Sequence, residues 1–149
     1  MFKHLLIATD GSELSELAVD RGLELASAVS ARVTAITVTE PLPIVGSFEM
    51  TVTFPVDEYE KGAAELANRR LAQVVDKAKS MHVACETVHV KDDYPAEGIL
   101  AFARKSDCDL IVMSTHSRKG LSKILLGSQA NKIVTSSPIP VLVCPPPGS

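Results

Sequence analysis

The chain has 149 residues, of which 46% are hydrophobic and 22% are charged, and its formal net charge is −3. These values predict a single globular domain over residues 1–149, large enough to bury a core of its own. They exclude a broad basic surface for nucleic acid, and no apolar run reaches membrane-spanning length, so we expect neither nucleic-acid nor membrane partners.

The cysteines and the N-terminus predict a cytoplasmic protein. Cys85, Cys108 and Cys144 are odd in number and widely spaced among apolar neighbours. This pattern indicates buried thiols in a reducing compartment, not a disulfide framework or a metal site. The N-terminus lacks the long apolar core and the cleavage pattern of a signal peptide.

Short apolar runs alternate with helical patterns along the whole chain. A short run closed by a polar turn predicts a buried strand, and apolar residues three and four positions apart predict a helix with one buried face. In chain order, the predicted elements are a strand at 5–8, a helix at 12–29, a strand at 33–38, a helix at 57–80, a strand at 83–90, a helix that begins near Pro95, a strand at 110–113, a helix at 128–135 and a strand at 140–144. This alternation predicts an open parallel sheet with helices on both faces.

Residues 40–55 interrupt the alternation. Pro41, Pro43 and Pro55 prevent a regular element, and the segment is long for a loop in a compact domain. It predicts a lid or a contact for a protein partner, and an excursion folded against the body is an equal alternative.

Two segments at predicted strand ends carry residues suited to binding. Ligands of open α/β sheets bind beyond the carboxyl ends of the strands. Asp10 directly follows the first strand, where it could accept hydrogen bonds from a base amine or a ribose hydroxyl, help to hold a divalent ion, or belong only to an Asp-Gly turn. Residues 114–128 combine small side chains with Arg118 and two lysines before a helix, which favours phosphate, although a solvated loop has the same composition.

The familiar catalytic signatures are absent from the sequence. It contains no P-loop, no dinucleotide-binding fingerprint and no G-x-S-x-G nucleophile elbow, and its four histidines lack metal-ligand spacing. We therefore predict no catalytic residue and no metal site, and we do not expect an enzyme.

Several segments follow one another in the order and spacing of a known family. They are Leu6-Ile7-Ala8-Thr9-Asp10-Gly11-Ser12, Pro95-Ala96-Glu97-Gly98-Ile99-Leu100, the run from Asp109 to His116, Leu125-Leu126-Gly127-Ser128 and Pro140-Val141-Leu142-Val143. With these segments the chain resembles universal stress proteins of the UspA type. The resemblance implies a Rossmann-like, adenine nucleotide alpha hydrolase-like fold, which is an open five-stranded parallel sheet of order 3-2-1-4-5. It also implies a homodimer that pairs through the last strand, at Val141, Leu142 and Val143.

The resemblance further implies an adenine nucleotide site. The family motif G-x-x-G, nine residues and G-[S/T] falls on Ser114, Ser117, Gly127 and Ser128, so serine replaces both leading glycines. If either position needs a positive φ, a non-glycine residue costs about 1–2 kcal/mol, and two such penalties weaken binding roughly 30- to 1,000-fold. The implied nucleotide-binding residues are Thr9, Asp10, Val38, Met113, Ser114, Ser117, Arg118, Gly127, Ser128 and Gln129.

These features together predict a cytoplasmic stress-response sensor or regulator. It would bind ATP, AMP or ADP, with magnesium as a companion ion, and hydrolyse ATP slowly at most. The alternative is a dimeric interaction module that binds no nucleotide and acts through residues 40–55 and its dimer surface. An enzyme of the wider adenine nucleotide hydrolase type would need a further catalytic domain.

Overall fold

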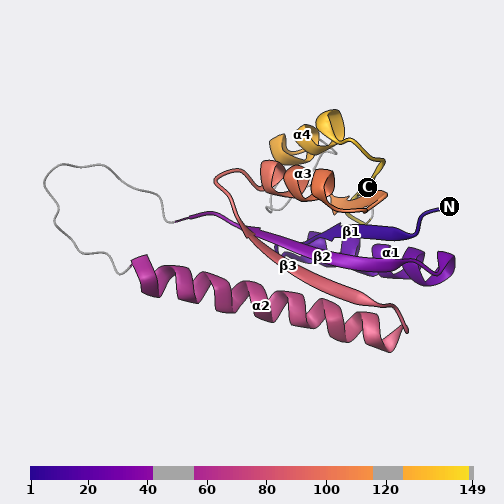
Figure 1. The fold of residues 1–149 in the computed structure, drawn as a ribbon, viewed down its shortest axis with the longest axis horizontal. Helices are drawn as coiled ribbons and strands as arrows, with labels where there is room; N and C mark the ends of the chain where they lie inside the picture. Colours follow the sequence, from indigo (N-terminus) through magenta and orange to yellow (C-terminus); the bar gives the residue numbers. More distant parts are fainter. Residues whose placement is uncertain (42–55, 116–125, 148–149) are drawn as a thin grey trace, which may run out of the picture.

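A computed structural model describes residues 1–41, 56–115 and 126–147. Within them, one five-stranded parallel sheet has the order β3-β2-β1-β4-β5 (Figure 1). Its strands are β1 (His4–Ala8), β2 (Arg32–Thr39), β3 (Cys85–Lys91), β4 (Leu110–Ser114) and β5 (Val141–Cys144). The predicted fold class and strand order are confirmed, and β1 and β4 are neighbours at the centre of the sheet.

Helices cover both faces of this sheet (Figure 1). In the described residues they are α1 (Glu13–Val29), α2 (Val56–Ser80), α3 (Pro95–Lys105) and α4 (Ser128–Ser136). The first two cover one face, and α3 and α4 cover the other. Residues 42–55, which include most of the predicted lid or partner segment, lie outside the described residues.

The two sides of β1 explain why its residues are apolar in succession. Leu5 and Ile7 belong to the core cluster under α1 and α2, whereas Leu6 belongs to the cluster under α3 and α4. All three side chains are fully buried because a strand's side chains alternate between two covered faces. Each contributes about 1.5–3 kcal/mol of burial free energy.

The third strand begins later than the sequence pattern predicts. His82 has a φ of 57°, and the N–H groups of Met81 and Val83 both donate to the Ala78 carbonyl. This turn of Met81 and His82 ends α2, and Val83 closes it through its N–H, so β3 starts at Cys85 and not at Val83 as predicted. The strand lies at the edge of the sheet and leaves Cys85 half-buried, whereas Cys108 and Cys144 are buried as predicted.

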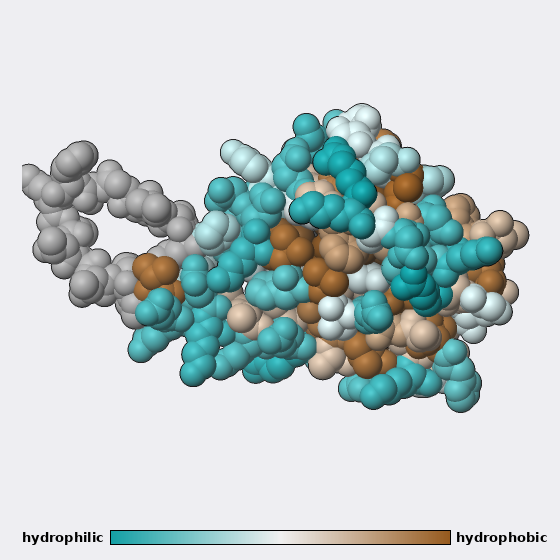
Figure 2. All heavy atoms as spheres, viewed as in Figure 1, coloured by the Kyte–Doolittle hydropathy of each residue, from teal (hydrophilic) through white to brown (hydrophobic). Residues whose placement is uncertain are grey.

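Hydrophilic residues cover much of the side of the molecule seen in Figure 2, and apolar residues gather in smaller patches between them. Among the exposed large apolar side chains of the described residues are Tyr94, 63% exposed just before α3, and Leu142, 38% exposed on β5. No helix in the described ranges is long and apolar enough to cross a membrane.

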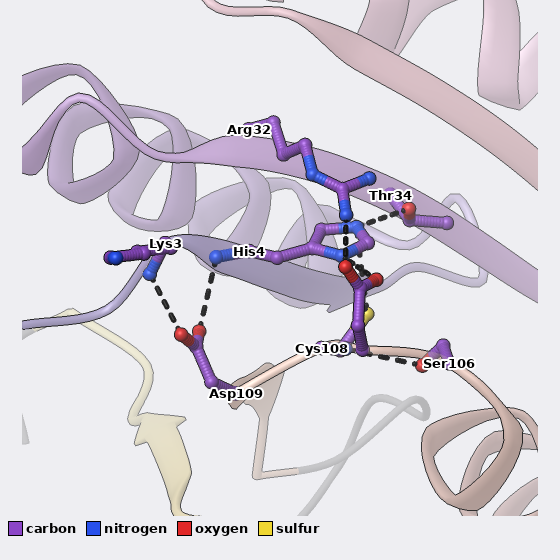
Figure 3. A network of polar contacts seen from close by, with 8 residues as sticks. Lys3, His4, Arg32, Thr34, Ser106, Cys108 and Asp109 are labelled. Carbon is purple, nitrogen blue, oxygen red and sulfur yellow. Dashed lines mark hydrogen bonds and ion pairs between the residues drawn. The ribbon is translucent and has the colours of Figure 1, made fainter.

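A polar network, the amino-end cluster, joins β1, β2 and the segment before β4 (Figure 3). The ring of buried His4 lies with Nδ1 2.8 Å from Asp107 Oδ1 and Nε2 2.7 Å from Thr34 Oγ1. Arg32 forms an ion pair with the same Asp107 carboxylate. The hydrogen bond from His4, followed by Arg32, lowers the pKa of the Asp107 carboxyl, whereas burial raises the pKa of the neighbouring Cys108 thiol. The cluster therefore ties β1, β2 and the segment before β4 together at the amino end of the sheet.

Candidate functional site

A cleft of about 560 Å³ lies beyond the carboxyl ends of β1, β2 and β4, between the N-termini of α3 and α4. Its volume falls in the range of about 300–1,000 Å³ that is typical of small-ligand pockets. The lining residues are Ala8, Thr9, Asp10, Ser15, Ile36, Val38, Glu40, Asp93, Tyr94, Pro95, Ala96, Ile99, Met113, Ser114, Thr115, Gly127, Ser128, Gln129, Ala130 and Ile133. The cleft lies where the strand order reverses, the usual ligand site in open α/β sheets.

Backbone and hydroxyl groups hold the turn that carries Asp10. The Thr9 N–H donates to the Ile36 carbonyl over 3.0 Å, and the Thr37 hydroxyl donates to the Thr9 carbonyl over 2.6 Å. Asp10 Oδ1 then accepts the Ser12 N–H over 2.9 Å. One carboxylate oxygen of Asp10 is therefore engaged in the turn, which fixes the side chain beside the cleft.

Gly11 completes this turn with a φ of 79°, in the left-handed region that glycine enters freely. The Arg70 side chain from α2 lies directly over it, since a Cβ on Gly11 would be 2.7 Å from Arg70 Cδ. The backbone conformation therefore favours glycine here, and the flexible Arg70 side chain would have to shift to admit a Cβ.

The opposite wall of the cleft is the first turn of α4. The Gly127 N–H donates to the Thr115 carbonyl over 3.1 Å, and the helix begins with a bond from the Asn131 N–H to the Gly127 carbonyl over 2.8 Å. The N–H groups of the next residues, Ser128 to Ala130, have no acceptor within the helix because they belong to its first turn. They and the helix dipole make this wall electropositive.

Gln129 ties the two helices together at the cleft. Its Oε1 accepts the Ala96 N–H over 3.0 Å, which links the start of α4 to the start of α3. Predicted as a phosphate-binding residue, Gln129 thus holds the cleft walls with its oxygen and keeps its amide nitrogen as a donor.

The predicted penalty for serine in place of glycine does not arise at Ser114. This residue ends β4, and the non-glycine residues with positive φ in the described ranges are Ser30 and His82. Ser114 therefore has no left-handed strain, so the condition on which the predicted penalty depends is not met at this position. Gly127 likewise has a φ of −60°, which any residue can adopt.

Thr115 is an unusual member of the cleft wall. Its residue is 3% exposed, and its hydroxyl Oγ1 has no hydrogen-bond partner among the described residues. A buried hydroxyl left without a partner costs about 1–3 kcal/mol. Sequence reasoning did not single out Thr115, which directly follows β4.

The charged side chains of the described lining are all acidic, namely Asp10, Glu40 and Asp93. Within this lining, the first turn of α4 is the feature that attracts negative charge. Tyr94 and Asp93 were also missed by sequence reasoning. Tyr94 did carry a signal of a role other than capping. It occupies the N-cap of α3 without a side-chain capping bond, a position where serine, threonine or aspartate is usual.

The structure brings most of the predicted nucleotide-binding residues into this one cleft. They are Thr9, Asp10, Val38, Met113, Ser114, Gly127, Ser128 and Gln129. The remaining two, Ser117 and Arg118, lie outside the described residues. Gly98 of α3 allows the helix to approach Val38 at the β2 side of the cleft, since a Cβ there would stand 3.1 Å from Val38 Cγ2.

Comparisons with known proteins agree with this architecture. The family model described as the Universal stress protein family matches residues 1–145. Universal stress protein MJ0531 of Methanocaldococcus jannaschii is 33% identical over 99% of this chain and 84% of its own length. Universal stress protein YxiE of Bacillus subtilis is 30% identical over 96% of this chain and 99% of its own.

Solved structures show the same fold. The structure of MJ0577 of Methanocaldococcus jannaschii has a TM-score of 0.85 and 25% identity, and the match covers 100% of this chain and 99% of that chain. A universal stress protein in complex with cAMP has a TM-score of 0.71 at 24% identity, with coverage of 96% and 97%. An Arabidopsis thaliana family protein with AMP bound has a TM-score of 0.67 at 16% identity, with coverage of 98% and 93%.

Proposed function

The chain belongs to the universal stress protein family, and from this premise we propose that it binds an adenine nucleotide as a sensor or regulator of the stress response. The proposal places its action in the cytoplasm and treats the chain as one domain. The observation that carries it is the cleft of about 560 Å³ at the reversal of strand order, with the first turn of α4 as an electropositive wall. Family structures with cAMP and AMP support adenine as the base.

The two ends of the cleft suit the two ends of a nucleotide. Val38 and the exposed ring of Tyr94 offer apolar surface for the base, and Asp10 offers a carboxylate oxygen to the ribose. Phosphates would lie at Ser114, Ser128 and the first-turn N–H groups. Since β2 and β4 flank β1, about 10 Å separates these ends, which a nucleotide spans.

Magnesium fits this site as a companion of the polyphosphate. Among residues 1–41, 56–115 and 126–147, no group of three or more potential ligand side chains could hold a metal ion. Magnesium usually keeps several waters and binds largely through substrate phosphates, so it can enter with the nucleotide although the free Asp10 oxygen is assigned to the ribose. We therefore propose ATP with magnesium, with ADP and AMP as ligands that need less charge compensation.

The proposal includes slow hydrolysis at most. The described lining contains no histidine, and Asp10 already uses Oδ1 to cap its own turn. No histidine is available there as a general base, and the bond within its own turn restrains Asp10, so we propose regulation through occupancy and not through turnover.

Titration calorimetry with ATP and magnesium tests the proposal. We expect a saturable heat of binding and a rise in melting temperature with nucleotide, because a ligand bound to the folded state stabilises it. The chain has two tyrosines and no tryptophan, so Tyr59→Phe leaves Tyr94 as the sole tyrosine emitter. Its fluorescence is expected to change when a base stacks on it.

Absence of heat and of thermal stabilisation at millimolar nucleotide would reject this function. The chain would then act as a stress-response module that binds other proteins, the alternative that the sequence left open. Tripolyphosphate without adenosine is the control for attraction by charge alone.

A further inference from the structure

We propose that the outer face of α2 is a self-association surface, on which the helices of two copies of this chain pair antiparallel. The inference goes beyond the proposed nucleotide binding and does not depend on it. The surface is also distinct from the predicted dimer edge at β5, because α2 packs on β2 and β3, at the other side of the sheet (Figure 1).

The outer face of α2 carries a row of charges that the fold leaves unpaired. The buried residues of the helix, Ala67, Leu71, Val74 and Ala78, lie on its inner side. At 3.6 residues per turn, six charged residues lie on the opposite side. They are Glu58, Lys61, Glu65, Arg69, Asp76 and Lys79. All six are exposed, and none forms an ion pair within residues 1–41, 56–115 and 126–147.

Charges on the flanks of α2 are, by contrast, used within the chain. Lys77 Nζ lies 3.1 Å from Glu16 Oε2 and 2.9 Å from Asp20 Oδ1 of α1. Glu60 forms an ion pair with Lys91 of β3 over 3.1 Å. The contacts of α2 with the rest of the fold therefore do not account for the outer row.

The order of signs along the outer row identifies the occupant. From Glu58 to Lys79 the charges alternate strictly between negative and positive, so the row read backward has every sign reversed. Antiparallel pairing of two copies therefore sets opposite charges against each other, whereas parallel pairing in register sets like charges together. Complementary charges of this kind fix the register and orientation of partners.

A two-fold axis beside Asn68 aligns the whole row. The pairs across it are Glu58 with Lys79, Lys61 with Asp76, and Glu65 with Arg69 of the second copy. Each pair is aligned within about two residues, or about 3 Å of helix length, and the symmetry makes each pair occur twice. The two Arg69 side chains approach each other near the axis, and the two Glu65 side chains beside them balance their charge.

Two residues beside the row also fit a helix contact. Leu66 is 42% exposed although it is large and apolar. Gly62 stands inside the helix, where glycine is unfavourable, and nothing lies within 4 Å of the position that its Cβ would take. The described fold therefore does not require glycine there, whereas a second helix can approach the bare backbone closely.

Sedimentation velocity at increasing protein concentration tests the pairing. At about 20 mM salt we expect the mass to double with concentration. At about 1 M salt we expect this association to be lost, because a Debye length near 3 Å screens exposed charges. Val143→Pro, which removes an outward N–H of β5, separates the two surfaces, and the α2 association is expected to persist in this variant.

Charge reversal and its compensation identify the pairs. Glu58→Lys and Lys79→Glu are each expected to weaken the association about tenfold, because the symmetry turns two attractive pairs into repulsive ones. The double variant Glu58→Lys, Lys79→Glu again sets opposite charges across the axis, so most of the association is expected to return. Since both reversals oppose the helix dipole, this return cannot come from a recovery of helix stability.

Lys105→Glu on α3 is the matched control. It makes the same change in net charge as Lys79→Glu, also in the last turn of a helix, and it is expected to leave the association unchanged. A mass that responds neither to salt nor to Glu58→Lys would overturn the proposal. A double variant that associates no better than either single variant would do the same, and both results would assign the row of charges to a solvated helix face.

Discussion

At the scale of single residues, small changes in backbone and side chain decide the shape of the cleft. Gly11 holds the turn that carries Asp10 in a left-handed conformation, and Arg70 covers it. Ser114, by contrast, occupies a motif position of the family in extended backbone. The backbone favours glycine at the first position and not at the second.

Gly11→Ala is expected to lower the free energy of unfolding by about 1–2 kcal/mol, because the added Cβ is strained at positive φ. Urea unfolding measures the loss. The Arg70 side chain can move aside. The double variant Gly11→Ala, Arg70→Ala is therefore expected to show most of the same loss of unfolding free energy. Full recovery in the double variant would assign the loss to the contact with Arg70.

Asp107 gives a pH-dependent prediction in the amino-end cluster. Its carboxyl pKa lies below the ordinary 3.8 because of His4 and Arg32, so the charged form stabilises the folded state. That contribution is complete above pH 3.8 and is lost as the pH falls through the lower pKa of the folded protein. Asp107→Asn is therefore expected to destabilise the protein near neutral pH, and the difference from wild type is expected to vanish in acid.

Urea unfolding of both proteins over a series of pH values measures this difference. Asp76→Asn removes an exposed carboxyl that has no ion pair among the described residues, and it controls for the change in net charge. A difference for Asp107→Asn that stays constant in acid would contradict the assigned role of the carboxylate.

At the scale of elements, β5 is an edge strand, which pairs only with β4 among the described residues. The Pro140 and Cys144 carbonyls accept bonds from β4, so the alternation of the strand directs the N–H and C=O groups of Val141 and Val143 outward. Such an edge can pair with another strand. The homodimer through β5 stays a prediction, since the structure contains one chain.

Val143→Pro tests that prediction. It removes an outward N–H and keeps the bonds to β4, so we expect a monomer with little loss of stability. Light scattering after size exclusion measures the mass. Leu142→Pro is the control, since it faces β4 and is expected to lower stability directly. A Val143→Pro protein that stays dimeric would place the interface elsewhere.

The elements also show what the sequence could predict and what it could not. Periodicity located each helix and strand because it reports which faces are buried, and it erred at β3, where the left-handed His82 turn has no apolar signature. The adjacency of β1 and β4 came from the family resemblance. No local sequence pattern predicts features that depend on the assembled sheet. Examples are the contact of His4 with Asp107, 103 residues away, and the unpaired buried hydroxyl of Thr115.

At the scale of the whole molecule, the two ends of the sheet differ in structure. The cleft occupies the carboxyl end, and the amino-end cluster closes the other. The five residues of β1 separate them by roughly 16 Å. Sites farther apart than about 10 Å with no shared partners usually contribute independently.

His4→Ala is therefore expected to lower the free energy of unfolding by about 1–3 kcal/mol, because it leaves Thr34 unpaired in the interior. The ATP dissociation constant is expected to stay within about twofold of wild type. Urea unfolding and calorimetry on the same variant measure both. A large change in affinity would mean that β1 transmits strain from one end to the other.

The extended backbone at Ser114 has an evolutionary consequence. Serine and glycine codons can differ by a single base, and neither residue strains the chain at this position. A lineage can therefore exchange the two without refolding, and selection would act on the exchange through its effect on the proposed nucleotide site. Sequences with serine and sequences with glycine at this position would then be closely related and would share one fold.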